Sequence, residues 1–115
     1  MNFYHIMLKK GIVIESVLQQ AQNKEDAQDQ IKENLRGYEV SGAYCTEIGA
    51  IMVLDSGDNY YKVRFNPGAC KYRSILVMGG NIADITAYIG QEYNIEDVTS
   101  IQRAYYTKIF FNIFL

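Results

Sequence analysis

The chain has 115 residues, of which 49% are apolar and 21% charged, and these values predict one soluble globular domain. Its net charge of −2 argues against a generic nucleic-acid coat, so nucleic-acid binding would need a local basic patch. No apolar run reaches the ~18 residues that span a bilayer, and the N-terminus lacks the order of a secretory signal. Two cysteines are too few for a disulfide framework. We therefore expect a cytoplasmic protein with no membrane partner.

The first half of the chain predicts strand, strand, helix, strand, strand. Residues 3–10 and 12–20 are rich in strand formers and are separated by Gly11, which favours a tight hairpin. Asn23 is a good N-cap for a helix with a narrow apolar stripe, and Gly37 is a natural stop after it. Residues 38–45 and 50–54 then read as extended segments.

The second half repeats this order after a turn at residues 55–59. Strands are predicted at 60–66 and 70–78 around the Pro67–Gly68 turn. Asn81 precedes a second helix over residues 83–93. An extended segment at 95–104 and a final apolar strand at 108–115 complete the order, and whether residues 112–115 belong to the core or to a contact stays open.

A comparison of the halves indicates an internal repeat. With an offset of 58 (73 − 15), seven of forty positions are identical between residues 15–54 and 73–112, against about two or three expected from typical composition. The sequence therefore predicts an α+β fold made of two tandem β-β-α-β-β repeats, residues 2–54 and 60–115, joined by the turn 55–59. We expect mostly antiparallel sheet, two helices, pseudo-twofold symmetry and one shared core in a single domain over residues 1–115. The identical pairs are Ser16/Ser74, Leu18/Leu76, Asn23/Asn81, Asp26/Asp84, Ile31/Ile89, Val40/Val98 and Ile51/Ile109.

The residues that most often carry catalysis or metal binding are sparse. His5 is the single histidine and lies in an apolar strand, which favours a structural role. Cys45 and Cys70 lack the spacing of a metal site or of a nucleophile with its base. Gly79 and Gly80 precede a helix, where backbone amides can meet phosphate, but Asp84 in the first turn would repel an anion. We expect no catalytic residue, no metal and no cofactor.

The second hairpin carries the clearest candidate site. If Lys62 faces Arg73 and Arg64 faces Lys71, all four cations share one face, with apolar side chains on the other. Like charges opposite each other are unfavourable unless carboxylates or an anion lie close. This face is either a solvated surface offset by nearby acids, or a site for phosphate, nucleic acid or an acidic protein.

The second helix has a wider apolar face than the first. This width predicts deeper burial as the central element of the core, or docking of a partner or a second copy of the chain. Tyr88 and Tyr93 on it are candidate partner contacts, because tyrosine joins apolar area to a polar tip. A half-buried position on the sheet surface is the alternative for such tyrosines.

The second half has an opening strand at Tyr61 to Val63, an acidic helix, and closing segments at Ser100 to Ala104 and Ile109 to Phe110. In these features it resembles a family of small uncharacterised proteins from Bacteroidetes and their phages. That family has no assigned activity or catalytic residues. The resemblance implies a small cytosolic protein encoded by a phage or mobile element.

We expect a non-catalytic interaction protein that binds another macromolecule, most simply an unidentified protein, as a phage-encoded modulator of a host system would. One alternative is a nucleic-acid-binding protein that uses the basic hairpin. Another is a binder of a small phosphorylated ligand between the repeats. A homo-oligomer is compatible with each reading.

Overall fold

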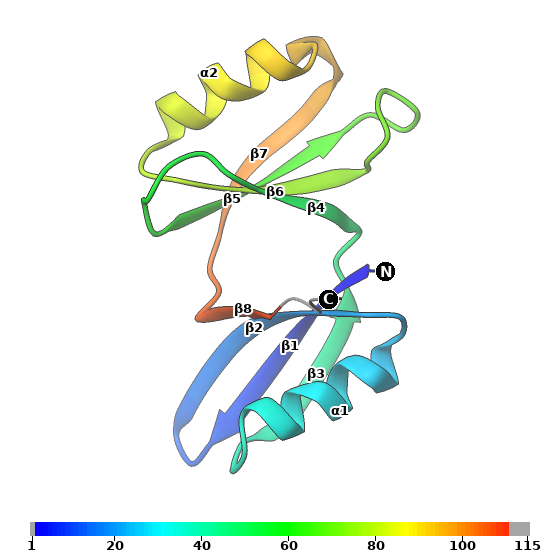
Figure 1. Cartoon of the computed structure of the whole chain (residues 1–115), viewed down its shortest axis with the longest axis vertical. Helices are drawn as coiled ribbons and strands as arrows, with labels where there is room; N and C mark the ends of the chain where they lie inside the picture. The colour runs from blue at the N-terminus through cyan, green and yellow to red at the C-terminus, as the bar shows by residue number, and fades with distance from the viewer. Residues whose placement is uncertain (1, 111–115) are drawn as a thin grey trace, which may run out of the picture. The chain divides into compact units, whose positions relative to one another are not determined.

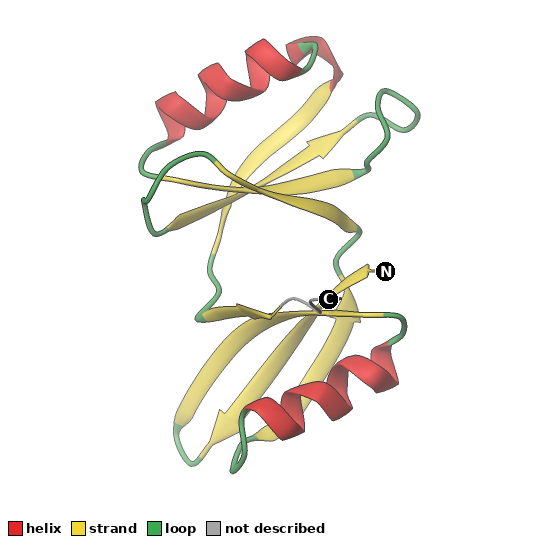
Figure 2. Cartoon of the chain, in the orientation of Figure 1, coloured by secondary structure: helices red, strands yellow, loops and turns green. Residues whose placement is uncertain are grey.

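The computed structural model of the chain describes residues 2–110, and these form an α+β fold (Figures 1 and 2). Two four-stranded sheets, mostly antiparallel, each carry one helix. No helix in this range is long and apolar enough to cross a membrane. The elements are β1 (Asn2–Lys10), β2 (Val13–Ala21), α1 (Lys24–Asn34), β3 (Glu39–Cys45), β4 (Ile48–Val53), β5 (Asn59–Phe65), β6 (Ser74–Gly79), α2 (Ile82–Glu92), the 3₁₀ turn η1 (Ile95–Asp97), β7 (Val98–Ala104) and β8 (Lys108–Phe110).

The chain divides into two compact units. Unit 1 contains residues 1–47 and 106–115, and unit 2 contains residues 48–105. The sheet of unit 1 has the order β3-β1-β2-β8, and that of unit 2 the order β4-β6-β5-β7. In each sheet three strands run antiparallel, and the fourth pairs in parallel with β2 or β6. The repeat predicted from the sequence is therefore present as two sheets of equivalent topology.

The repeat boundaries and the unit boundaries differ, because each repeat gives its last strand to the other unit. Strand β4 follows β3 in the chain but pairs with β6, whereas β8 follows β7 but pairs with β2. The identities found in the sequence lie at these pairings: Ile51 is opposite Leu76, and Ile109 is opposite Leu18. Residues 48–53, predicted to complete the first repeat, thus belong to the second unit.

The two helices begin with the same cap. The Asn23 side-chain oxygen accepts from the Asp26 N–H at 2.8 Å, and that of Asn81 accepts from the Asp84 N–H at 2.9 Å. The amide group of each asparagine donates back to the carboxylate of the same aspartate. An Asn and an Asp three residues apart thus satisfy backbone groups that a helix leaves open at its start, which explains why both stretches carry this pair.

The edge strands β3 and β7 each contain a β-bulge at the equivalent position. The register shifts at Met7/Leu8 opposite β3 and at Arg64/Phe65 opposite β7. At each shift a hydroxyl bonds a neighbouring carbonyl: Ser41 donates to Met7 and Thr99 to Arg64, at 3.2 and 3.1 Å. A bulge disrupts the ladder locally and makes an edge harder to extend with another strand.

Each unit has its own buried cluster between its sheet and its helix. In unit 1 the side chains are Tyr4, Ile6, Leu8, Val17, Ala21, Ala27 and Ile31. In unit 2 they are Tyr61, Val63, Phe65, Ile75, Val77, Ile85 and Ile89. Alternation along the strands and the helical spacing of four residues bring these side chains to one face of each element. Each unit thus packs its helix on its own sheet, and the single shared core expected from the sequence stays a prediction.

Two further expectations are wrong in detail. Helix α2 buries Ile85 and Ile89, the equivalents of the two residues that α1 buries, so its wider apolar face gives no deeper burial. Ile82 at its start is 47% exposed. The strand expected from Cys70 begins only at Ser74, because residues 66–73 form a loop. Residues 112–115 lie outside the described part of the chain.

Candidate interaction surfaces

The predicted pairing of the four cations Lys62, Arg64, Lys71 and Arg73 is wrong. Arg64 lies opposite Ser74, and Lys62 lies opposite Leu76. The loop displaces Lys71 and Arg73 from the strand, so the β5–β6 register differs from the one expected for a tight hairpin. Lys62 and Arg64 still share the face of β5 that points away from α2, because Tyr61, Val63 and Phe65 occupy the other face.

Three of the four cations are exposed, but the strand residues next to them on β6 are buried. Arg64, Lys71 and Arg73 are exposed, whereas Lys62 is half-buried. The cross-strand partners Ser74 and Leu76 are 1% and 0% exposed, so the neighbouring part of β6 is closed to a large ligand. The exposed cations therefore lie around the loop at the end of β5 rather than on one open sheet face.

The hairpin between β1 and β2 carries the most exposed aliphatic surface of the described residues. Ile12 is 98% exposed, Ile14 65% and Val13 48%, and we refer to these three residues as the aliphatic tip. Gly11 has a φ of +62° and makes the tight turn that presents them. Successive strand residues face opposite sides, so the tip is apolar on both faces of the hairpin.

Sequence reasoning assigned this segment to a strand and missed its exposure. The signal available was a run of three β-branched residues directly after a turn glycine, where alternation between apolar and polar residues stops. Lys9 and Lys10 precede the tip and pair across the hairpin with Ile14 and Val13. The tip thus combines an aliphatic end with two cationic side chains behind it.

The equivalent face of the two sheets has diverged. With the offset of 57 that relates β1 to β5, His5 corresponds to Lys62 and Met7 to Arg64. Met7 is 39% exposed, so the face in unit 1 continues the apolar character of the tip. Unit 1 therefore carries His5 and Met7 at the two strand positions where unit 2 carries Lys62 and Arg64.

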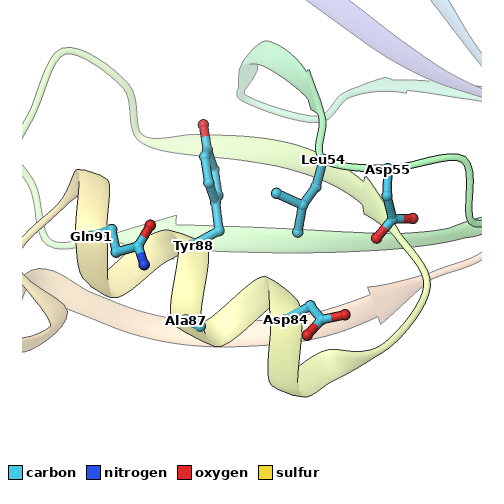
Figure 3. A pocket seen from close by; sticks show the side chains of 6 residues that line it. All are labelled: Leu54, Asp55, Asp84, Ala87, Tyr88 and Gln91. Carbon is cyan, nitrogen blue, oxygen red and sulfur yellow. The ribbon is translucent and has the colours of Figure 1, made fainter.

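A shallow hollow of about 260 Å³ lies on unit 2 between the end of β4 and α2 (Figure 3). Leu54 and Asp55 line it from one side, and Asp84, Ala87, Tyr88 and Gln91 from the helix. Its two carboxylates disfavour a phosphorylated ligand at this place.

Both carboxylates of the hollow also have structural partners. Asp55 accepts from the N–H groups of Gly57 and Gly80 at 2.7 and 3.3 Å, and Asp84 belongs to the helix cap. The Gly80 N–H, considered from the sequence as a hydrogen-bond donor to a phosphate, thus already donates to a carboxylate. These bonds hold the loop after β4 against the Gly79–Gly80 segment.

The candidate tyrosines Tyr88, in α2, and Tyr93, directly after it, are half-buried and pack against the cluster of unit 2. The Tyr93 ring lies 4.8 Å from the Phe65 ring, centroid to centroid. Burial, followed by the neighbouring Tyr88, raises the pKa of Tyr93. Tyr93 is thus held in the structure of unit 2, and Tyr88 is the one of the pair that lines the hollow.

His5 lies among aromatic residues in unit 1, as its apolar strand predicted. Its Nδ1 is 2.7 Å from the Tyr44 hydroxyl, and its ring meets the Tyr106 ring edge-on at 5.4 Å. Burial, followed by the effect of Tyr44, raises the pKa of Tyr106 to about 12. The contacts link β1, β3 and the segment before β8, so this group stabilises the sheet of unit 1.

Neither cysteine belongs to a cluster of metal-ligating side chains within residues 2–110. Cys45 is exposed and Cys70 half-buried, both as thiols, and the Cys70 Sγ lies 3.2 Å from the Tyr72 carbonyl oxygen. No group of three or more His, Cys, Asp or Glu side chains in that range could hold a metal ion.

The chain matches no protein-family model, no curated protein and no solved structure.

Proposed function

We propose that this protein is a non-catalytic interaction protein that binds another macromolecule, most simply a protein, and that the aliphatic tip makes the central contact. The observation that carries this proposal is the exposure of three consecutive β-branched side chains, with Ile12 at 98%. Fully burying one such side chain stabilises a complex by about 1.5–3 kcal/mol. Exposed apolar surface of this kind is typical of contact sites.

The charges around the tip define the kind of partner. Lys9 and Lys10 lie opposite Ile14 and Val13 in the hairpin, next to the aliphatic tip. A partner with an apolar pocket and an acidic rim is therefore complementary. The exposed thiol of Cys45 is compatible with the reducing cytoplasm, where we place the protein. The resemblance described above supports an origin in a phage or mobile element and a role as a modulator of a host system.

The test is an affinity capture from a lysate of the host cell, with and without nuclease, using the wild type and the double variant Ile12→Ser/Ile14→Thr. A stoichiometric protein that survives nuclease and is lost with the double variant supports the proposal. The matched control is Val53→Thr/Ile82→Ser, which changes two aliphatic residues of unit 2 that are 66% and 47% exposed. Equal capture by all three proteins contradicts a role of the tip.

Nucleic-acid binding is the second candidate, favoured by the exposure of Arg64, Lys71 and Arg73 in one unit. Replacing all three by alanine would then reduce binding to a single-stranded oligonucleotide and flatten its dependence on salt, because fewer counterions are released. Binding that is unaffected by these replacements or by salt would remove this candidate.

A further inference from the structure

The sheet of unit 1 is completed by a segment that follows the whole of unit 2 in the chain. Strand β8 pairs in parallel with β2 through Val17/Lys108, Leu18/Ile109 and Gln19/Phe110. The Thr107 N–H extends this ladder by donating to the Ser16 carbonyl at 2.8 Å. Phe110 packs against the buried cluster of unit 1.

A second copy of the chain can make the same contacts. The groups that β8 meets in these pairings all belong to residues 1–47, and β8 of another copy offers them identical partners. The contact energy of the ladder is therefore equal within one chain and between two. What differs is the conformation of the linkers between the units and the entropy of association.

The linker between β3 and β4 is short and strained. It consists of Thr46 and Glu47, and Glu47 has a φ of +61°, in the left-handed region that costs a non-glycine residue free energy. Thr46 is fixed, because both its N–H and its hydroxyl donate to the Phe3 carbonyl, at 3.1 and 2.8 Å. The strain is thus confined to Glu47, and a short strained linker favours exchange between copies.

We propose that the chain forms a strand-exchanged dimer, in which β8 of each copy completes the sheet of unit 1 in the other. The linker at Glu47 opens and leaves the left-handed region. The residues 1–47 of one copy then close on β8 of its partner, with all pairings of β8 preserved. The occupant of the edge of β2 in the dimer is therefore a second copy of this chain.

The first test is the mass in solution by light scattering over a concentration series up to hundreds of micromolar. We expect a concentration-dependent dimer. Glu47→Gly relieves the strain without exchange and should raise the dimer dissociation constant by about tenfold or more, since both linkers lose their driving force. Glu47→Ala retains the strain and controls for loss of the side chain. A monomer at every concentration, or a dimer equally stable in both variants, overturns the proposal.

The second test identifies the strand that is exchanged. In a background of Cys45→Ser and Cys70→Ser, one copy carries Ser16→Cys and the other Thr107→Cys, two neighbouring positions of the β2–β8 ladder. After the two are unfolded and refolded together and oxidised, a disulfide-linked heterodimer is expected. Each variant alone is the control and should not cross-link. Absence of the heterodimer, together with an intramolecular disulfide when both cysteines are in one chain, shows that β8 closes on its own copy.

Discussion

Replacing Gly57 by alanine should destabilise unit 2, because the loop after β4 packs directly on the backbone before α2. A Cβ at position 57 would lie 2.5 Å from both the Gly79 carbonyl carbon and the Gly80 Cα. Backbone atoms cannot move aside as a flexible side chain can. Such overpacking typically costs 1–3 kcal/mol.

The shift would also disturb the bonds that hold the loop. Asp55 binds Gly57 and Gly80 through its two carboxylate oxygens, and the Asn59 amide donates to the Gly80 carbonyl at 2.9 Å. We expect a total loss of about 2 kcal/mol in the free energy of unfolding, or about 8 °C in Tm. The assay is urea unfolding followed by far-UV circular dichroism, since the chain has no tryptophan.

The matched control is Gly90→Ala in α2. Nothing lies within 4 Å of a Cβ at this position, and Gly90 is exposed. The same change should therefore stabilise the protein by about 0.5–1 kcal/mol, because alanine loses less backbone entropy in a helix. If Gly57→Ala stays within 0.5 kcal/mol of the wild type while Gly90→Ala stabilises, the described packing of the loop is refuted.

Four further substitutions have defined outcomes. Asn23→Ala and Asn81→Ala should each cost about 1 kcal/mol in urea unfolding, since each removes an equivalent helix cap, and a change in only one would mean that the caps are not equivalent. Ile89→Ala should cost about 3 kcal/mol in the same assay, because the side chain is 0% exposed; a loss below 1 kcal/mol would contradict its burial. The stability that Tyr106 confers is complete below its unfolded pKa of ~10 and is lost as pH rises towards its folded pKa of about 12. Tyr106→Phe should therefore flatten the decline of stability between these pH values, and an unchanged profile would refute the role of its burial.

The candidate surfaces could be predicted only in part. The sequence indicated the cations of the second hairpin, but not that the loop 66–73 would separate two of them from β5. It did not indicate the exposure of Ile12, because a β-branched residue beside a turn reads equally well as the start of a buried strand. Exposure depends on which segments cover a residue, and those segments lie elsewhere in the chain.

The sequence by itself determined the elements and their order. Hairpin glycines, the Asn–Asp caps and the alternation of apolar residues act through neighbours in the chain, so their outcome can be read locally. They placed both helices, most strands and the repeat. The identities Leu18/Leu76 and Ile51/Ile109 could also be found in the sequence, but the sequence did not show which strand each of these residues pairs with.

Only the tertiary structure decided which strand completes which sheet. Strands β4 and β8 occupy equivalent positions in the two repeats, and so do the edges of β2 and β6. Local signals therefore do not distinguish pairing within a repeat from exchange between repeats. A parallel pairing needs a connection long enough to return the chain to the same end of the sheet. The two residues between β3 and β4 are too few for β4 to return to β2, whereas β8 reaches it after the whole of unit 2.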